Sequence, residues 1–136
     1  MTRVIAIVLY WLAAIVITLG AFGHGFVGVI PIRDAIDAST LPLDVTRTLW
    51  IVWYGTSLSM ITYGALLFWA WPALKAGSSS RSMPALIVGA FYLLVGVGAY
   101  FYSGGDAFWI MFIVLGVLAI GTTLFLGGAR TPSRGR

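Results

Sequence analysis

The sequence predicts an all-α membrane protein, a four-transmembrane-helix bundle with both termini in the cytoplasm. Three observations predict this fold class: the composition, the spacing of the charges, and the distribution of basic and acidic residues among the segments between the apolar runs. Of the 136 residues, 60% are apolar and 9% are charged, and the mean hydropathy is +1.01. Soluble domains carry charge on about a quarter of their residues, so this composition excludes a soluble domain.

Charged residues divide the chain into four long runs that hold no charge apart from the titratable His24. The runs contain 29, 27, 24 and 23 residues. A helix needs about 20 apolar residues to cross the hydrocarbon, so each run supplies one crossing. A helix satisfies its own backbone polar groups in lipid, whereas an open strand does not. The predicted spans are Val4–Phe26, Thr48–Trp71, Pro84–Tyr102 and Ala107–Gly127.

The segments between the spans carry helix and turn signals. Pro31, with apolar residues after it, predicts a short helix on the membrane surface. Pro72 predicts the end of the second span. Asp106 is the predicted N-cap of the fourth span, because it follows a Ser-Gly-Gly turn. Residues 1–129 form one predicted transmembrane domain, and the basic tail 130–136 is predicted to be disordered in the cytoplasm.

The charges also predict the orientation. With a cytoplasmic N-terminus, six basic residues lie inside, whereas Arg33, Arg47 and all four Asp residues lie outside. This distribution follows the positive-inside rule. The first apolar run is longer than that of a signal peptide, so we expect an uncleaved first span. The pI of about 9.9 then reflects attraction to lipid headgroups rather than to nucleic acid.

Small residues on every span predict close helix contacts, because helices in lipid associate through packing. The candidates are Gly20, Gly23, Gly25, Gly28, Gly55, Ser59, Gly89, Gly96, Gly98, Gly116 and Gly121. The second span also carries many hydroxyl groups, on more than one face, so we expect it to be the most buried of the four.

His24 is the residue with the most distinctive chemistry. It lies in a Gly-rich stretch near the outer end of the first span, where ionisable groups are costly and often functional. A neutral imidazole there could ligate haem, hydrogen-bond a quinone or relay protons. The structural alternative is a histidine bonded to a backbone carbonyl or an outer Asp. One histidine supplies one axial ligand, so a bis-histidine haem would need a second copy or a partner.

The outer mouth of the bundle, around His24, Arg47, Trp50 and Tyr54, is the predicted ligand-binding site. His24 and Arg47 would bind a ligand headgroup, while the aromatic rings would pack against its flat part. An aromatic cage that adds Trp53 is an alternative, and an interfacial aromatic belt is the ordinary explanation. The outer Asp residues could hold a hard cation, but pairing with the neighbouring Arg residues is more common.

The residue types that are absent exclude several functions. The chain contains no Glu, Gln, Asn or Cys. It therefore lacks the membrane Glu of small multidrug transporters, the buried Asn of double-barrelled fluoride channels and the thiols of quinone-linked enzymes. No catalytic constellation is found, so we predict no enzyme and no catalytic or metal site.

Two motifs resemble a family of uncharacterised small bacterial four-helix membrane proteins. They are Gly23-His24-Gly25 and the segment from Arg47-Thr-Leu-Trp50 to Gly55-Thr-Ser-Leu-Ser59, and the resemblance covers about residues 20–65. The family has an acid after the Trp, where this chain has Ile51. The resemblance supports the topology and implies that His24, Arg47 and Trp50 lie together, but it implies no reaction.

We therefore predict a non-enzymatic integral protein of the bacterial inner membrane. Its expected role is that of an accessory subunit or a binder of a hydrophobic ligand such as a lipid, quinone or pigment. The alternative is a redox module in which His24 ligates haem or contacts quinone. A third interpretation is a small channel or carrier lined by the hydroxyls of the second span. The expected partners are the lipid bilayer and another membrane protein complex or a second copy.

Overall fold

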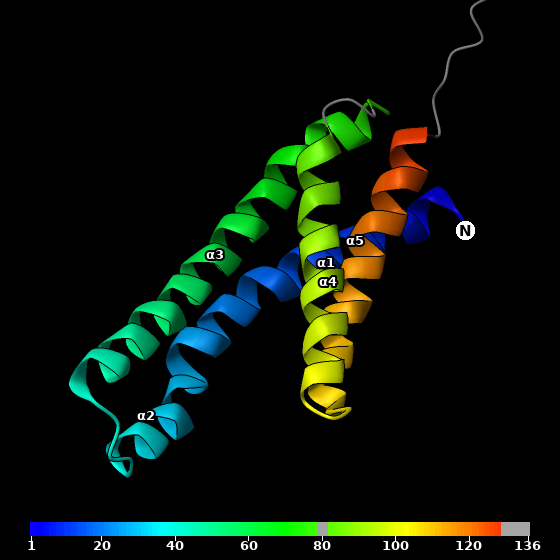
Figure 1. The fold of residues 1–136 in the computed structure, drawn as a ribbon. Coiled ribbons are helices and arrows are strands. Elements are labelled where there is room, and N and C mark those ends of the chain that lie inside the picture. The colour runs from blue at the N-terminus through cyan, green and yellow to red at the C-terminus, as the bar shows by residue number, and fades with distance from the viewer. Residues whose placement is uncertain (79–81, 129–136) are drawn as a thin grey trace, which may run out of the picture. The chain divides into compact units, whose positions relative to one another are not determined.

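A computed structural model describes residues 1–78 and 82–128 of the chain. In this part of the chain all regular structure is helical, as Figure 1 shows. Four segments are long and apolar enough to cross a membrane, namely Arg3–Asp37, Leu43–Lys75, Met83–Tyr102 and Ala107–Gly128. The predicted all-α class and the four candidate spans are thereby confirmed. The tail 130–136 lies outside the described residues.

The first helical segment is longer than predicted. It consists of α1 (Arg3–Phe22), the π-helical turn η1 (Gly23–Val27) and α2 (Val29–Asp37). The expected short helix after Pro31 is present as α2. No loop separates it from the span, because Gly28 continues the helical path in the right-handed conformation.

Helix α3 (Leu43–Lys75) corrects the predicted end of the second span. Pro72 lies inside α3, which continues for almost a full turn beyond it. The helix ends instead in a Schellman motif, in which Ser78 N–H donates to Ala73 O and Gly77 N–H donates to Leu74 O. Gly77 has a φ of 73°, a conformation that only glycine adopts at no cost. Glycine rather than proline therefore terminates this helix.

Helices α4 (Met83–Tyr102) and α5 (Ile110–Gly128) form a hairpin, and the short helix η3 (Ala107–Trp109) precedes α5. Their bounds agree closely with the predicted third and fourth spans. The turn places Gly104 and Gly105 at positive φ, and the Asp106 side chain accepts a hydrogen bond from Phe108 N–H at 2.9 Å. The predicted N-cap is confirmed.

Glycine permits the close approach of α4 and α5. A Cβ at Gly116 would lie 2.5 Å from the backbone nitrogen of Leu93, and one at Gly96 would lie 2.7 Å from that of Ile113. Gly89 is equally close to Ile120. Of the glycines predicted to pack, Gly23, Gly55, Gly98 and Gly121 have open space beside them.

The chain divides into two compact units, and α1 and α3 each contribute to both. One unit joins residues 1–15 to the chain from Leu66 onward. In it, the buried Tyr10 donates a hydrogen bond to Leu67 O at 2.6 Å and stacks on Trp71. Trp11 contacts both Phe68 and Trp71. Aromatic packing thus joins the start of α1 to the end of α3.

The second span is the least buried of the four, which corrects the expectation that it would be the most buried. In the most apolar window of each span, 11% of the residues are buried in α3, against 28–39% in the others. Three of its hydroxyls find their hydrogen-bond acceptor within α3 itself. Those of Thr56, Ser59 and Thr62 each donate to the carbonyl four residues earlier in α3.

Candidate functional site

The second compact unit, Val16–Ala65, contains the π-helical turn at Gly23–Val27. Its defining hydrogen bond runs from Gly28 N–H to Gly23 O over 2.8 Å. Pro31 gives a reason for the change of pattern, since it has no N–H to donate to the carbonyl of Val27 four residues earlier. Single π-helical turns inside α-helices are rare and are frequently found at functional sites.

His24 lies in this turn and makes three contacts with α3. Its Nδ1 is 2.9 Å from Ser57 Oγ. Its ring stacks on Trp53, with the ring centroids 3.8 Å apart and the planes 18° from parallel. Its backbone carbonyl accepts a hydrogen bond of 3.2 Å from Trp53 Nε1. Both the backbone and the imidazole of His24 are therefore fixed by residues one helical turn apart on α3.

Two glycines allow α3 to approach the turn closely. A Cβ at Gly25 would lie 3.3 Å from Ser57 Oγ, and one at Gly28 would lie 3.2 Å from Trp53 Cζ2. Both distances are tighter than ordinary van der Waals contact. Gly25 and Gly28, which follow His24 in the chain, therefore have a packing role that is specific to Ser57 and Trp53.

The hydrogen bond at Nδ1 makes Nε2 the ring nitrogen that a ligand can use. Ser57 Oγ also lies 3.4 Å from Trp53 O. When the hydroxyl donates to that carbonyl, it accepts from Nδ1–H, and Nε2 carries a lone pair. When the hydroxyl donates to Nδ1, Nε2 carries the proton instead. The same arrangement can thus offer either an acceptor or a donor at Nε2.

The other predicted site residues lie along α3. Trp50 stacks on Tyr54, with ring centroids 6.0 Å apart, and Arg47 is exposed. A helix turns by about 100° per residue, so Tyr54 points away from the edge that carries Trp53. Arg47 precedes Trp53 by roughly 9 Å along the helix axis. The structure brings His24 to Trp53 and Ser57, and pairs Trp50 with Tyr54.

Ser57 and Trp53 were not among the predicted site residues. The sequence points to Trp53 only through the alternative of an aromatic cage, and to Ser57 only as one of many hydroxyl-bearing residues in the second span. Their spacing of four residues, which places two side chains on one helix edge, was the available signal. Gly25 and Gly28, close to His24, mark the matching surface on the first span.

The described residues contain no group of three or more His, Cys, Asp or Glu side chains that could hold a metal ion. Asp34 and Asp37 lie in α2, while Asp44 lies in the first turn of α3. The cation site considered for the outer loop therefore has no support among these residues.

Comparison of the chain with protein-family models, with curated proteins and with solved structures gives no match. The family resemblance therefore stays a prediction, and the functional argument depends on the geometry of the site.

Proposed function

We propose that this chain is a non-enzymatic integral membrane protein that binds a hydrophobic ligand through a polar headgroup at His24. Lipids, quinones and pigments combine an apolar body with such a headgroup. The observation that carries the proposal is the fixed imidazole, held at Nδ1 by Ser57 and on one face by Trp53. Polar groups that fix a ligand's orientation are few and rigid in an otherwise apolar site.

In this proposal the binding site lies at the outer mouth of the helices. Nε2 of His24 meets the ligand headgroup, and the exposed Arg47 extends its charge toward the same headgroup from the start of α3. The stacked pair of Trp50 and Tyr54 offers a flat apolar surface on an adjacent face of α3. The protein serves as an accessory subunit of a membrane complex or as a binder of this ligand.

The proposed location is the bacterial inner membrane, with both termini in the cytoplasm. The orientation is supported by the distribution of charge, because it leaves only Arg33 and Arg47 of the eight basic residues on the outer side. Positive residues are retained on the cytoplasmic side of short loops. This orientation places the turn at Gly23–Val27 toward the outer leaflet.

A redox module is the second candidate, and the bond between Nδ1 and Ser57 supports it. Histidines that ligate a metal generally donate their other ring N–H to a hydrogen-bond acceptor, which fixes the tautomer. In this case Nε2 would ligate haem iron or contact a quinone carbonyl. A channel has less support, since Thr56, Ser59 and Thr62 direct their hydroxyl protons to carbonyls of α3.

Solvent extraction followed by mass spectrometry tests the main proposal. The gently purified protein should carry one hydrophobic compound in stoichiometric amount, and His24→Ala should lose it. Ser59→Ala is the matched control, because that hydroxyl bonds only within α3 and its variant should keep the compound. Equal retention by all three proteins would overturn the proposal. An absorbance spectrum before and after dithionite identifies the redox alternative by a Soret band that disappears in His24→Ala.

A further inference from the structure

We propose a second lipid site in the other compact unit, where a groove at the C-terminal end of α3 binds one anionic phospholipid. An acyl chain would lie in the groove, and the phosphate would lie at Arg3 and Lys75. This proposal is independent of the ligand at His24.

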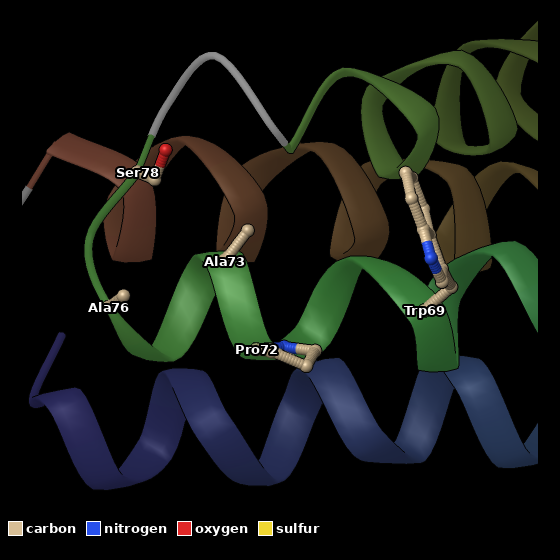
Figure 2. Close-up of a pocket in the computed structure, with 5 residues that line it drawn as sticks. All are labelled: Trp69, Pro72, Ala73, Ala76 and Ser78. Carbon is tan, nitrogen blue, oxygen red and sulfur yellow. The ribbon is translucent and has the colours of Figure 1, made fainter.

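The groove has a volume of about 360 Å³ and is shown in Figure 2. Its lining residues are Trp69, Pro72, Ala73, Ala76 and Ser78. The first four are spaced i, i+3, i+4 and i+7, so they share one edge of α3. Trp69 stands at one end of the groove and Ser78 at the other, as Figure 2 shows. The edge from Trp69 to Ala76 is roughly 10 Å long, enough for a segment of an acyl chain.

The side chains that line the groove suit a lipid tail. Alanine at positions 73 and 76 leaves room, and the ring of Pro72 adds an apolar wall. Trp69 is 68% exposed, so its indole offers a large apolar surface to a bound chain. Tryptophan is enriched at the level of the headgroups because its ring is apolar and its N–H is polar.

The charge at the Ser78 end of the groove suits a phosphate. The Arg3 guanidinium donates a hydrogen bond of 3.0 Å to Lys75 O, which places it at the last turn of α3. Lys75 directly precedes the lining residue Ala76 in the chain. That bond uses one of the five N–H donors of the guanidinium, and others can bind phosphate oxygens. All four Asp residues lie elsewhere in the sequence, at positions 34, 37, 44 and 106.

An anionic phospholipid matches both the apolar groove and the two basic residues, Arg3 and Lys75. An uncharged lipid would leave the two cations without a counter-ion, and a soluble anion would leave the exposed indole and the groove in water. In the predicted orientation the end of α3 lies at the cytoplasmic leaflet, where anionic lipids attract basic residues.

Native mass spectrometry of the full chain in detergent tests the proposal, with phosphatidylglycerol and phosphatidylcholine as the probes. The wild type should bind one phosphatidylglycerol more tightly than phosphatidylcholine. Lys75→Gln should lower the affinity for phosphatidylglycerol about fivefold, which is the effect of one charge near the membrane surface. The affinity for phosphatidylcholine should not change. Ala73→Phe, which fills the groove, should lower the affinity for both lipids.

Arg33→Gln and Ala35→Phe are the matched controls, because they make the same kinds of change on α2, in the other unit. Both should bind the two lipids as the wild type does. Circular dichroism checks the fold, and Ala76→Phe replaces Ala73→Phe if that variant loses helix. Equal binding of the two lipids by the wild type, or an unchanged preference in Lys75→Gln, would overturn the proposal. So would displacement of the lipid by glycerol 3-phosphate, since that result would mean that the groove contributes nothing.

Discussion

His24 is oriented by two side chains that lie one turn apart on α3. The stacking of the imidazole on Trp53 and the bond from Nδ1 to Ser57 act on different parts of the ring. Stacked aromatic pairs contribute about 0.5–1.5 kcal/mol beyond the area they bury. Loss of either contact should therefore affect the direction of Nε2 more than the stability of the helices.

Replacing Ser57 with Ala removes the partner of Nδ1 and should reduce retention of the ligand. Hydrogen bonds between membrane helices contribute about 0.6 kcal/mol on average, so the protein should remain folded. The measurement is the amount of compound extracted per chain, with Ser59→Ala as the control. Full retention in Ser57→Ala would mean that this hydrogen bond does not position the ligand-binding nitrogen.

Gly25 and Gly23 offer a matched pair in the same turn. A side chain at Gly25 meets Ser57, whereas one at Gly23 meets nothing within 4 Å. Gly25→Val should therefore cost about 1–3 kcal/mol of stability and release the ligand. Gly23→Val should have a much smaller effect on both. Thermal unfolding followed by circular dichroism, together with ligand extraction, separates the two variants, and equal effects would contradict the described contact.

His24 could be singled out from the sequence because it is the only histidine of the chain and lies within a long apolar run. Its partners Trp53 and Ser57 could not be singled out in this way. In lipid both the outer and the inner face of a helix are apolar, so the apolar periodicity does not identify the face that packs against another helix. A shift of one position along α3, from Trp53 to Tyr54, changes the direction of a side chain by about 100°. The resemblance to a family implied proximity of His24 to Arg47 and Trp50, and that arrangement stays a prediction.

At the scale of elements, glycine and proline act differently in the four spans. Pro31 lies just beyond the π-helical turn, while Pro72 lies inside α3 and leaves the helix continuous. Proline could be recognised in the sequence, but its effect on a helix depends on the residues around it. The Schellman motif at Gly77 needs backbone hydrogen bonds to Ala73 and Leu74, which a proline signal alone does not predict.

The hairpin of α4 and α5 gives a sharp test of glycine packing. Gly116→Leu should weaken the hairpin by about 1–3 kcal/mol or more, because even a Cβ would lie 2.5 Å from the Leu93 backbone. Gly121→Leu makes the same change on the same helix, at a position where a Cβ would meet no neighbouring atom within 4 Å. Unfolding in mixed micelles of increasing denaturing detergent should separate the two. A Gly116→Leu variant as stable as Gly121→Leu would contradict the close approach.

At the scale of the whole molecule, composition and charge spacing were sufficient to predict four helical spans, and α4 and η3–α5 match their predicted bounds closely. The first and second spans are longer than predicted, because polar residues such as Asp34 and Asp44 continue the helices beyond the apolar runs. Charge spacing locates the apolar core of a span, whereas hydrogen bonding determines where the helix ends.

Single cysteines can test the predicted orientation, because the natural chain contains none. Ser39→Cys and Ser103→Cys should react with a membrane-impermeant maleimide added to intact cells. Thr2→Cys should react only after the membrane is permeabilised. The reverse pattern would place the N-terminus outside, and the His24 turn toward the cytoplasm.

The most direct test of the central claim uses the single histidine of this chain as its own reporter. The protein is labelled with ¹⁵N-histidine, purified without a histidine tag, and compared by NMR before and after its bound compounds are removed. We expect Nε2 to shift on removal while Nδ1 stays in place, and Nδ1 to shift in Ser57→Ala. An unchanged Nε2 signal would mean that no ligand contacts His24, and would contradict the proposed binding function.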